Sequence, residues 1–128
     1  MPLIRSHRDL IVWQKSMDLV EQVYALTQEF PADERFRLTG QATRAAVSVP
    51  ANVAEGHSRA TRRDYAHFVA IAKGSLMELE TYVMIAMRLG YVDAHRTHGI
   101  LLHIGEVSRM LTSLRRRLAE LRTVNPER

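Results

Sequence analysis

The chain has 128 residues, the usual size of one domain, and 46% of them are hydrophobic, an ordinary fraction for a chain that folds around a core. The absence of cysteine excludes a disulfide framework and thiolate chemistry. The formal net charge is +4, no signal-peptide pattern opens the chain, and its apolar runs are too short to cross a bilayer, so we expect a cytoplasmic protein with no membrane partner.

Residues 9–29 form the first predicted helix. Apolar positions recur along it every three or four residues, which is the period of a core-facing helix. Ser6 and Asp9 have the spacing of an N-terminal capping box, and Pro31 ends the helix. The apolar positions form two adjacent rows, the first of which includes a serine: Val12, Ser16, Leu19, Val23, Leu26 and Phe30, then Trp13, Met17, Val20 and Tyr24.

The second predicted helix covers residues 33–56 and contains Pro50. Proline lacks a backbone N–H, so we expect it to kink or break the helix just before it. Asn52 and Glu55 follow this proline and are expected to satisfy backbone groups that the kink frees. Gly56 is expected to cap the end of the helix.

The third and fourth predicted helices cover residues 62–89 and 93–121. Thr61 and Asp64 have the spacing of a capping box at the start of the third helix. Gly74 lies in its interior, where glycine costs about 1 kcal/mol relative to alanine, so we expect a close helix–helix contact there. The fourth helix has a heptad seam of apolar residues: Ile104, Val107, Leu111, Leu114, Leu118 and Leu121.

Four long helices joined by short loops place sequence neighbours antiparallel. The predicted fold class is therefore all-α, an antiparallel up-down four-helix bundle. No linker or low-complexity tract divides the chain, and we expect residues 1–128 to form a single domain.

None of the residue patterns indicates catalysis. A di-iron site in a four-helix bundle needs Glu-x-x-His on two of its helices. Here Glu78 and Glu80 lie two residues apart, and His103 precedes Glu106 in the reversed order. A Gly-x-Ser-x-Gly elbow and a glycine-rich phosphate loop are both missing. We therefore expect no enzyme activity, no cofactor and no metal site.

The positive charge is concentrated near the end of the chain. Residues 1–93 contain 11 Lys/Arg and 11 Asp/Glu, whereas residues 94–128 contain seven arginines and three glutamates. Arginine contacts phosphate through two N–H groups and stacks on bases, so one interpretation is a nucleic-acid-binding surface and the other is a solvated face. The candidate contacts form one cluster on the fourth helix and a second around the turn between the second and third helices: Arg109, Arg115, Arg116, Arg117 and Arg122, then Arg59, Arg62 and Arg63 with His57 and His67 beside them.

Several stretches of the chain together resemble a known family. They are Leu10-Ile11-Val12-Trp13-Gln14-Lys15, the segment from Gln41 to Gly56, Tyr65-Ala66-His67-Phe68, the segment from Ile71 to Glu80, and Leu89-Gly90-Tyr91. In this order and spacing they are similar to the four-helix-bundle proteins encoded by intervening sequences in bacterial 23S rRNA genes. The resemblance covers residues 9–121.

This resemblance implies an up-down four-helix bundle that assembles as a homopentamer in the bacterial cytoplasm and has no enzymatic activity. It also implies a connection to nucleic acid, since one relative is an accessory protein to the reverse transcriptase of diversity-generating retroelements and engages nucleic acid through a basic surface. The positions that match the family are interpreted as packing or subunit contacts: Asn52, Glu55, Gly56, Gly74, Ser75, Glu78 and Glu80.

We therefore expect a homo-oligomeric, non-catalytic scaffold that binds nucleic acid, with RNA favoured over DNA, through the two arginine clusters. The alternative is a protein-interaction adaptor, for example an accessory to a reverse transcriptase, with no nucleic-acid affinity of its own. The pattern leaves open whether the basic fourth helix faces outward or lines a central pore of the assembly.

Overall fold

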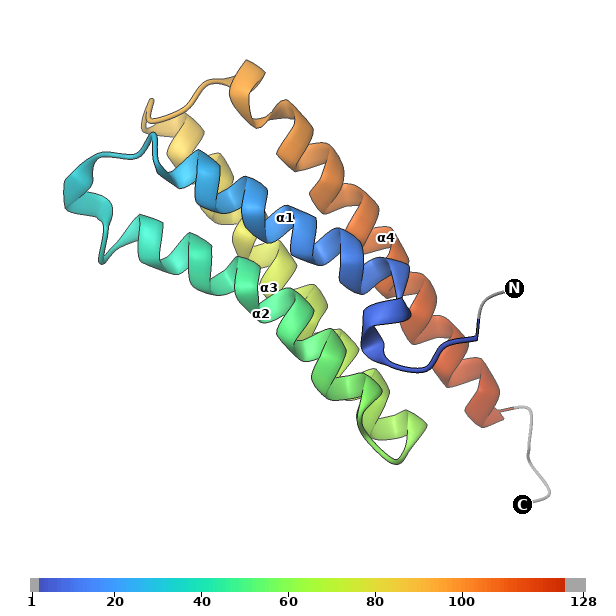
Figure 1. Ribbon diagram of the computed structural model, residues 1–128. Helices are drawn as coiled ribbons and strands as arrows, with labels where there is room; N and C mark the ends of the chain where they lie inside the picture. Colours follow the sequence, from blue (N-terminus) through green and yellow to red (C-terminus); the bar gives the residue numbers. More distant parts are fainter. Residues whose placement is uncertain (1–2, 124–128) are drawn as a thin grey trace.

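Four helices form an antiparallel bundle in the computed structural model, which describes residues 3–123 and the side chains of residues 3–120 (Figure 1). The N-terminal segment, the α2–α3 turn and the last turns of α4 lie at one end of the bundle, and the other two connections lie at the opposite end (Figure 1). The predicted all-α four-helix bundle is thus confirmed. Its elements are two short 3-10 helices and four long helices: η1 (His7–Asp9), α1 (Ile11–Thr27), η2 (Ala32–Glu34), α2 (Leu38–His57), α3 (Arg62–Arg88) and α4 (Ala94–Thr123).

One apolar core runs along the bundle. Each helix packs against its two neighbours, α1 and α3 each lying between α2 and α4. Leu19 and Leu26 of α1, Leu76 of α3 and Leu111 of α4 are fully buried in this core. The predicted second row of α1 is wrong at Met17 and Tyr24, which are exposed because they lie on the side of α1 that no other helix covers. The seam on α4 is confirmed where side chains are described: Ile104, Val107, Leu111 and Leu118 are buried and Leu114 is half-buried, whereas the side chain of Leu121 lies outside the described part.

The first helix is shorter than predicted at both ends. The Ser6–Asp9 capping box is present, but it caps η1, and Leu10 in extended conformation separates η1 from α1. The backbone N–H of Arg8 donates to the Ser6 hydroxyl, and those of Arg5 and Ser6 donate to the Asp9 carboxylate. These bonds hold the N-terminal segment in a defined turn before α1.

Glu34 explains why α2 begins at Leu38 and not at residue 33. Its side chain accepts a hydrogen bond from the backbone N–H of Leu38 at 3.1 Å, replacing an intrahelical acceptor at the start of α2. The same carboxylate accepts the hydroxyl of Tyr91 at 2.6 Å. Glu34 therefore joins the start of α2 to the α3–α4 connection.

α2 runs unbroken through Pro50, so the predicted break there is wrong. The carbonyl that loses its donor at this proline belongs to Ala46, whereas the Asn52 amide donates to the carbonyl and hydroxyl of Ser48. The Ser48 hydroxyl in turn shares a hydrogen bond of 2.9 Å with that of Ser75. Asn52 thus supports a polar contact between α2 and α3.

The predicted roles of the two glycines are both wrong. Gly56 lies inside α2, where an added Cβ would meet the Cβ of Phe68 at 2.9 Å and the ring of Tyr65 at 3.0 Å. Gly74 is exposed, and nothing lies within 4 Å of the position its Cβ would take. The close helix–helix contact expected at Gly74 is therefore made at Gly56.

The third helix ends at Arg88, one residue before the predicted end. Gly90 has a φ of 78°, and the backbone N–H groups of Gly90 and Tyr91 donate to the carbonyls of Met87 and Ala86. This is a Schellman motif, which requires a residue that tolerates the left-handed conformation. At the start of α3, the Thr61 hydroxyl accepts the N–H of Asp64 at 3.1 Å, which is one of the two hydrogen bonds of the predicted capping box.

Truncating the buried Leu111 to alanine is expected to lower the free energy of unfolding by about 2–5 kcal/mol, because it leaves a cavity in the core. Leu102 lies on the same helix but is 59% exposed, so Leu102→Ala is a matched control expected to cost about 0.5 kcal/mol or less. Denaturant unfolding measures both variants. Equal losses would contradict the placement of α4 in the bundle.

Tyr91→Phe is expected to make the free energy of unfolding depend less on pH in the acidic range. The pKa of Glu34 lies below its ordinary value of 4.5, chiefly because of the Tyr91 hydroxyl and then because of the N–H of Leu38. Such a carboxylate stabilises the folded state above its ordinary pKa, and this contribution is lost as the pH falls through the lowered value. The wild-type chain should therefore be more stable than Tyr91→Phe at neutral pH, and the difference should shrink as the pH falls from neutral to below 4.5, the ordinary pKa of this group.

Thermal unfolding across this pH range checks the prediction. Tyr24→Phe is the control, since the Tyr24 side chain is half exposed on the outer side of α1. A gap between the wild type and Tyr91→Phe that stays constant with pH would show that the carboxylate of Glu34 is not the group involved.

Candidate nucleic-acid interface

The two predicted arginine clusters lie at the same end of the bundle (Figure 1). We call this part the basic end and define it as residues 3–14, 52–67 and 109–120. It contains nine arginines and four carboxylates, whereas the other residues with described side chains include seven Lys/Arg and nine carboxylates. The charge of the molecule is therefore polarised along the bundle axis.

Electrostatic contacts between the segments show how close they come. Burial raises the pKa of Tyr65 in the first turn of α3, and the nearby Arg117 guanidinium of α4 opposes that rise. The pKa of Asp9 in η1 is lowered mainly by the two backbone N–H groups that donate hydrogen bonds to its carboxylate. His57, at the end of α2, lowers it further. Since η1 also contacts α2 and α3 contacts α4, these four segments are neighbours at the basic end.

Every predicted arginine whose side chain is described is exposed. These are Arg59, Arg62, Arg63, Arg109, Arg115, Arg116 and Arg117. Arg122 belongs to the last turn of α4, but its side chain lies outside the described part of the structure. The backbone therefore presents this set of cations to solvent and not to the core.

Arg59 differs from the others because it already has partners. It pairs with Glu55 at 2.7 Å, and its guanidinium lies 4.7 Å from the centre of the Phe68 ring. Glu55 therefore acts at the α2–α3 turn and not at Pro50. Among the side chains that the structure describes, no ion pair involves the remaining six: Arg62, Arg63, Arg109, Arg115, Arg116 and Arg117.

Two further arginines at this end were missed by the sequence analysis. Arg5 and Arg8 lie in the turn that the Ser6–Asp9 box stabilises, and the Arg8 carbonyl accepts the amide of Gln14 at 2.8 Å. The ring of His7 lies against Trp13 with centroids 5.1 Å apart, which fixes the same segment to α1. The capping box indicated an ordered turn, but no local pattern indicated that the turn would lie beside α4.

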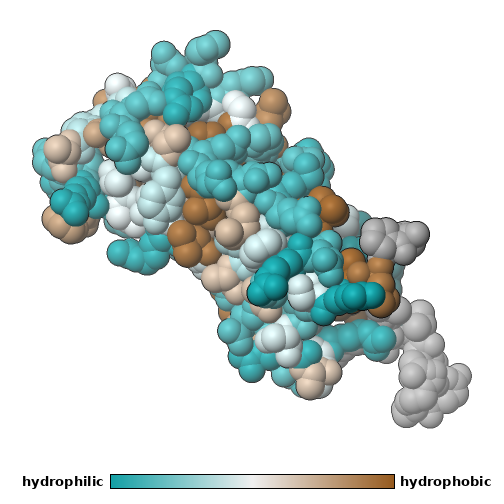
Figure 2. Space-filling model, in the orientation of Figure 1, coloured by the Kyte–Doolittle hydropathy of each residue, from teal (hydrophilic) through white to brown (hydrophobic). Residues whose placement is uncertain are grey.

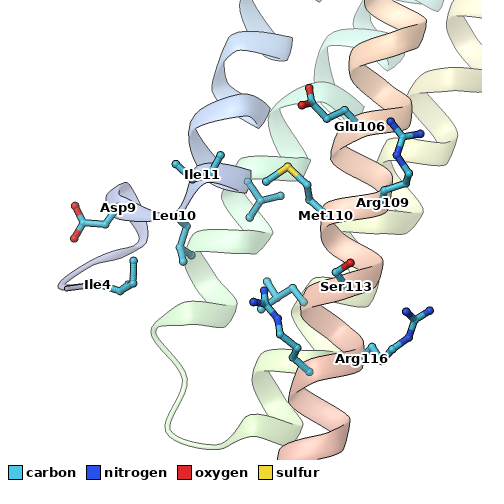
Figure 3. A pocket seen from close by; sticks show the side chains of 12 residues that line it. Ile4, Asp9, Leu10, Ile11, Glu106, Arg109, Met110, Ser113 and Arg116 are labelled. Atoms are coloured by element: carbon cyan, nitrogen blue, oxygen red, sulfur yellow. The ribbon is translucent and has the colours of Figure 1, made fainter. Parts of the chain in front are cut away.

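An open groove of about 920 Å³ lies between the N-terminal segment and α4 at the basic end (Figure 3). We call it the terminal groove. In Figure 3, Met110 of α4 points toward Leu10 and Ile11. Arg109, Arg116 and Arg117 also belong to the lining, although Arg109 and Arg116 extend from the side of α4 that is turned away from Leu10 and Ile11. The space-filling view shows apolar surface among hydrophilic side chains next to the N-terminal segment (Figure 2). The groove thus combines apolar walls with a cationic edge.

A second groove, of about 280 Å³, lies on the outer side of α2 and α3. Its lining is mainly polar and includes Arg44 and Glu78, together with the Ser48–Ser75 pair. Neither charged side chain has an ion-pair partner within the described residues. Gly74 is adjacent to this groove in the sequence and on the helix surface.

The described residues offer no group of three or more His, Asp or Glu side chains that could hold a metal ion. Within the same residues, no helix combines the length and the apolar character needed to span a membrane. What the basic end can do chemically is bind anions through exposed guanidinium groups, which present fixed donors suited to phosphate.

Comparisons with known proteins bear on the fold and the family. A family model described as 23S rRNA-intervening sequence protein matches residues 8–113. A comparison with curated proteins gave no match. Among solved structures, the chain is similar to a protein with unknown function from the S23 ribosomal protein family of Bacteroides thetaiotaomicron, with 22% identity and a TM-score of 0.75 over 81% of this chain and 97% of that chain.

These findings leave part of the basic end unaddressed. At this level of identity the structural likeness shows the fold alone. The family match ends at residue 113, so the run of Arg115, Arg116 and Arg117 lies beyond it. The function of that run has to be argued from its own surroundings.

Proposed function

The chain belongs to the 23S rRNA-intervening sequence protein family, and from the geometry of its basic end we propose that it is a cytoplasmic, homo-oligomeric, non-catalytic scaffold that binds nucleic acid. One observation supports this above the others: arginines from three separate segments come together at one end of the bundle, most of them without an ion-pair partner among the described side chains. RNA is favoured over DNA because the family is described by its connection with 23S rRNA.

Phosphate binding explains why arginines would be gathered in this way. Like charges that are crowded together repel one another, and each phosphate contact relieves that repulsion while releasing condensed counterions. Six arginines without ion pairs would make the affinity depend steeply on salt, on the order of a thousandfold between 50 and 200 mM. Contacts of this kind fix the position of a nucleic acid without reading its sequence.

Self-association would repeat the basic end and add weak contacts together through multivalency. The outer face of α2 and α3 supports it. Ile71 and Ile85 are exposed there, in the same helical row as Gly74 and Glu78, and the open space over Gly74 would admit the backbone of another copy. The charges of Arg44 and Glu78 could pair across such an interface. The family resemblance favours five copies.

Replacing Arg115, Arg116 and Arg117 together with glutamate is expected to weaken nucleic-acid binding by more than about tenfold at matched ionic strength and to lower the salt slope by about three. The reason is that three phosphate contacts become repulsive. Fluorescence anisotropy with labelled structured RNA, single-stranded RNA and duplex DNA across a salt series measures this effect.

A charge-matched control reverses three exposed arginines at the opposite end of the bundle, Arg35, Arg37 and Arg88. This control should bind within about threefold of the wild type, because these side chains lie away from the basic end. Undiminished binding by the first variant would remove the α4 cluster from the interface. If the wild type binds none of the three probes even at low salt, the scaffold proposal fails and the adaptor alternative takes its place.

Gly74→Arg is expected to reduce the mass of the assembly without unfolding the chain, since the side chain would enter the interface with another copy. Gly99→Arg is the matched control, because Gly99 is also an exposed helical glycine with nothing within 4 Å of its Cβ position. Light scattering after size exclusion gives the mass, and circular dichroism gives the helix content. Unchanged mass in both variants would exclude the face around Gly74 as the interface.

A further inference from the structure

We propose that the terminal groove binds unpaired bases of the nucleic acid whose phosphates the arginines contact, so that the preferred ligand is a single-stranded segment. This inference rests on the proposed function and specifies its substrate. The observation behind it is that exposed apolar side chains and three arginines of α4 belong to the lining of the same groove.

The walls of the groove are more exposed than apolar side chains usually are. Ile4 is 47% and Ile11 is 54% exposed, and they lie opposite the half-buried Met110 and Leu114. Exposed apolar surface that is bordered by polar groups is typical of binding sites. The volume of about 920 Å³ also falls within the range of ligand sites.

The edge of the groove selects an anion. Arg109, Arg116 and Arg117 line it, and none of them has an ion pair among the described side chains. Both acidic residues in the lining already have partners. The Asp9 carboxylate accepts two backbone N–H groups, and Glu106 pairs with Lys15 at 3.1 Å. Neither carboxylate forms an ion pair with these arginines among the described side chains, and the three guanidinium groups outnumber the two carboxylates in the lining.

A nucleotide has both of the required properties, a flat base that stacks on apolar surface and a phosphate that pairs with guanidinium. Ser113 is exposed and lines the same groove as the apolar side chains and the arginines. Its hydroxyl can form a hydrogen bond with the edge of a base. Met110 is unbranched and adapts to the shape of its neighbour.

Whether the nucleic acid is paired or single-stranded decides whether the apolar walls of the groove add to its affinity. In a duplex each base is covered by its stacked neighbours and its partner, so the apolar side chains gain no contact while the arginines still reach phosphates. In an unpaired strand the bases can turn out and stack on the protein. The arginines alone would bind both forms, and the groove would add affinity for the single strand only.

The test compares an RNA of about 12 nucleotides, free of self-complementarity, with the same strand annealed to its complement. Fluorescence anisotropy on the full chain should show that the wild type binds the single strand at least about tenfold more tightly than the duplex. A single-stranded DNA of the same sequence shows whether the preference extends to both sugars.

The double variant Ile4→Asn with Ile11→Asn should lose this preference, to within about twofold, while duplex affinity and salt slope remain unchanged, because the arginines are intact. Leu102→Asn is the control, since Leu102 is an equally exposed apolar residue outside the groove. Circular dichroism melting establishes that both variants are folded. If the double variant proves unfolded, Ile11→Asn alone serves for the same comparison.

Equal binding of single strand and duplex by the wild type, or a preference that survives in the folded variant, would overturn the groove assignment and leave the proposed scaffold intact. Binding of an acidic amphipathic peptide that is lost in the isoleucine variant, without any strand preference, would overturn it in favour of a protein ligand. No binding of any nucleic acid would remove the scaffold proposal and this inference together.

Discussion

At Gly56 the backbone of α2 approaches α3 so closely that a side chain of any size would collide with Tyr65 and Phe68. The basic end depends on this contact. It lets a short turn join the two helices, and it brings Phe68 under the guanidinium of Arg59, which also pairs with Glu55. Tyr65, which takes part in this contact, also lies near Arg117, because α3 packs against α4. Apolar packing thus holds together a set of cations that would otherwise separate by repulsion.

The opposite end is built from different interactions, and the contrast gives the molecule its polarity. There a carboxylate is an organising group: Glu34 accepts hydrogen bonds from the start of α2 and from the hydroxyl of Tyr91. The ring of Tyr91 also lies against Phe30, with centroids 5.8 Å apart. Glu29 pairs with Arg96 at this end, whereas the arginines of the basic end mostly lack ion pairs within the described residues. An incoming polyanion would therefore meet the bundle at one end.

The sequence was sufficient for features that depend on local spacing. The apolar period predicted four helices and most of the core, and the heptad seam of α4 identified Leu111 as buried. It was insufficient where the cause lies elsewhere in the chain. The reason for glycine at position 56 is a ring on the next helix, and the start of α2 depends on a carboxylate that also binds Tyr91. The meeting of the two arginine clusters follows from antiparallel topology and could have been deduced, whereas the position of Arg5 and Arg8 could not, because no periodicity governs the N-terminal segment.

The fold and the proposed binding surface are separable in this chain. The family match, residues 8–113, includes the Gly56 contact, the α2–α3 turn and nearly all of the described core, whereas the arginine run of α4 lies beyond it on exposed positions. Substitutions at exposed helical positions change stability little, so the charge there can vary without disturbing the bundle. The apolar walls of the terminal groove are constrained differently, since Leu10 and Met110 also pack against the core. In the proposed interface, affinity for phosphate would therefore change through the arginines while the shape of the groove stays fixed by the fold.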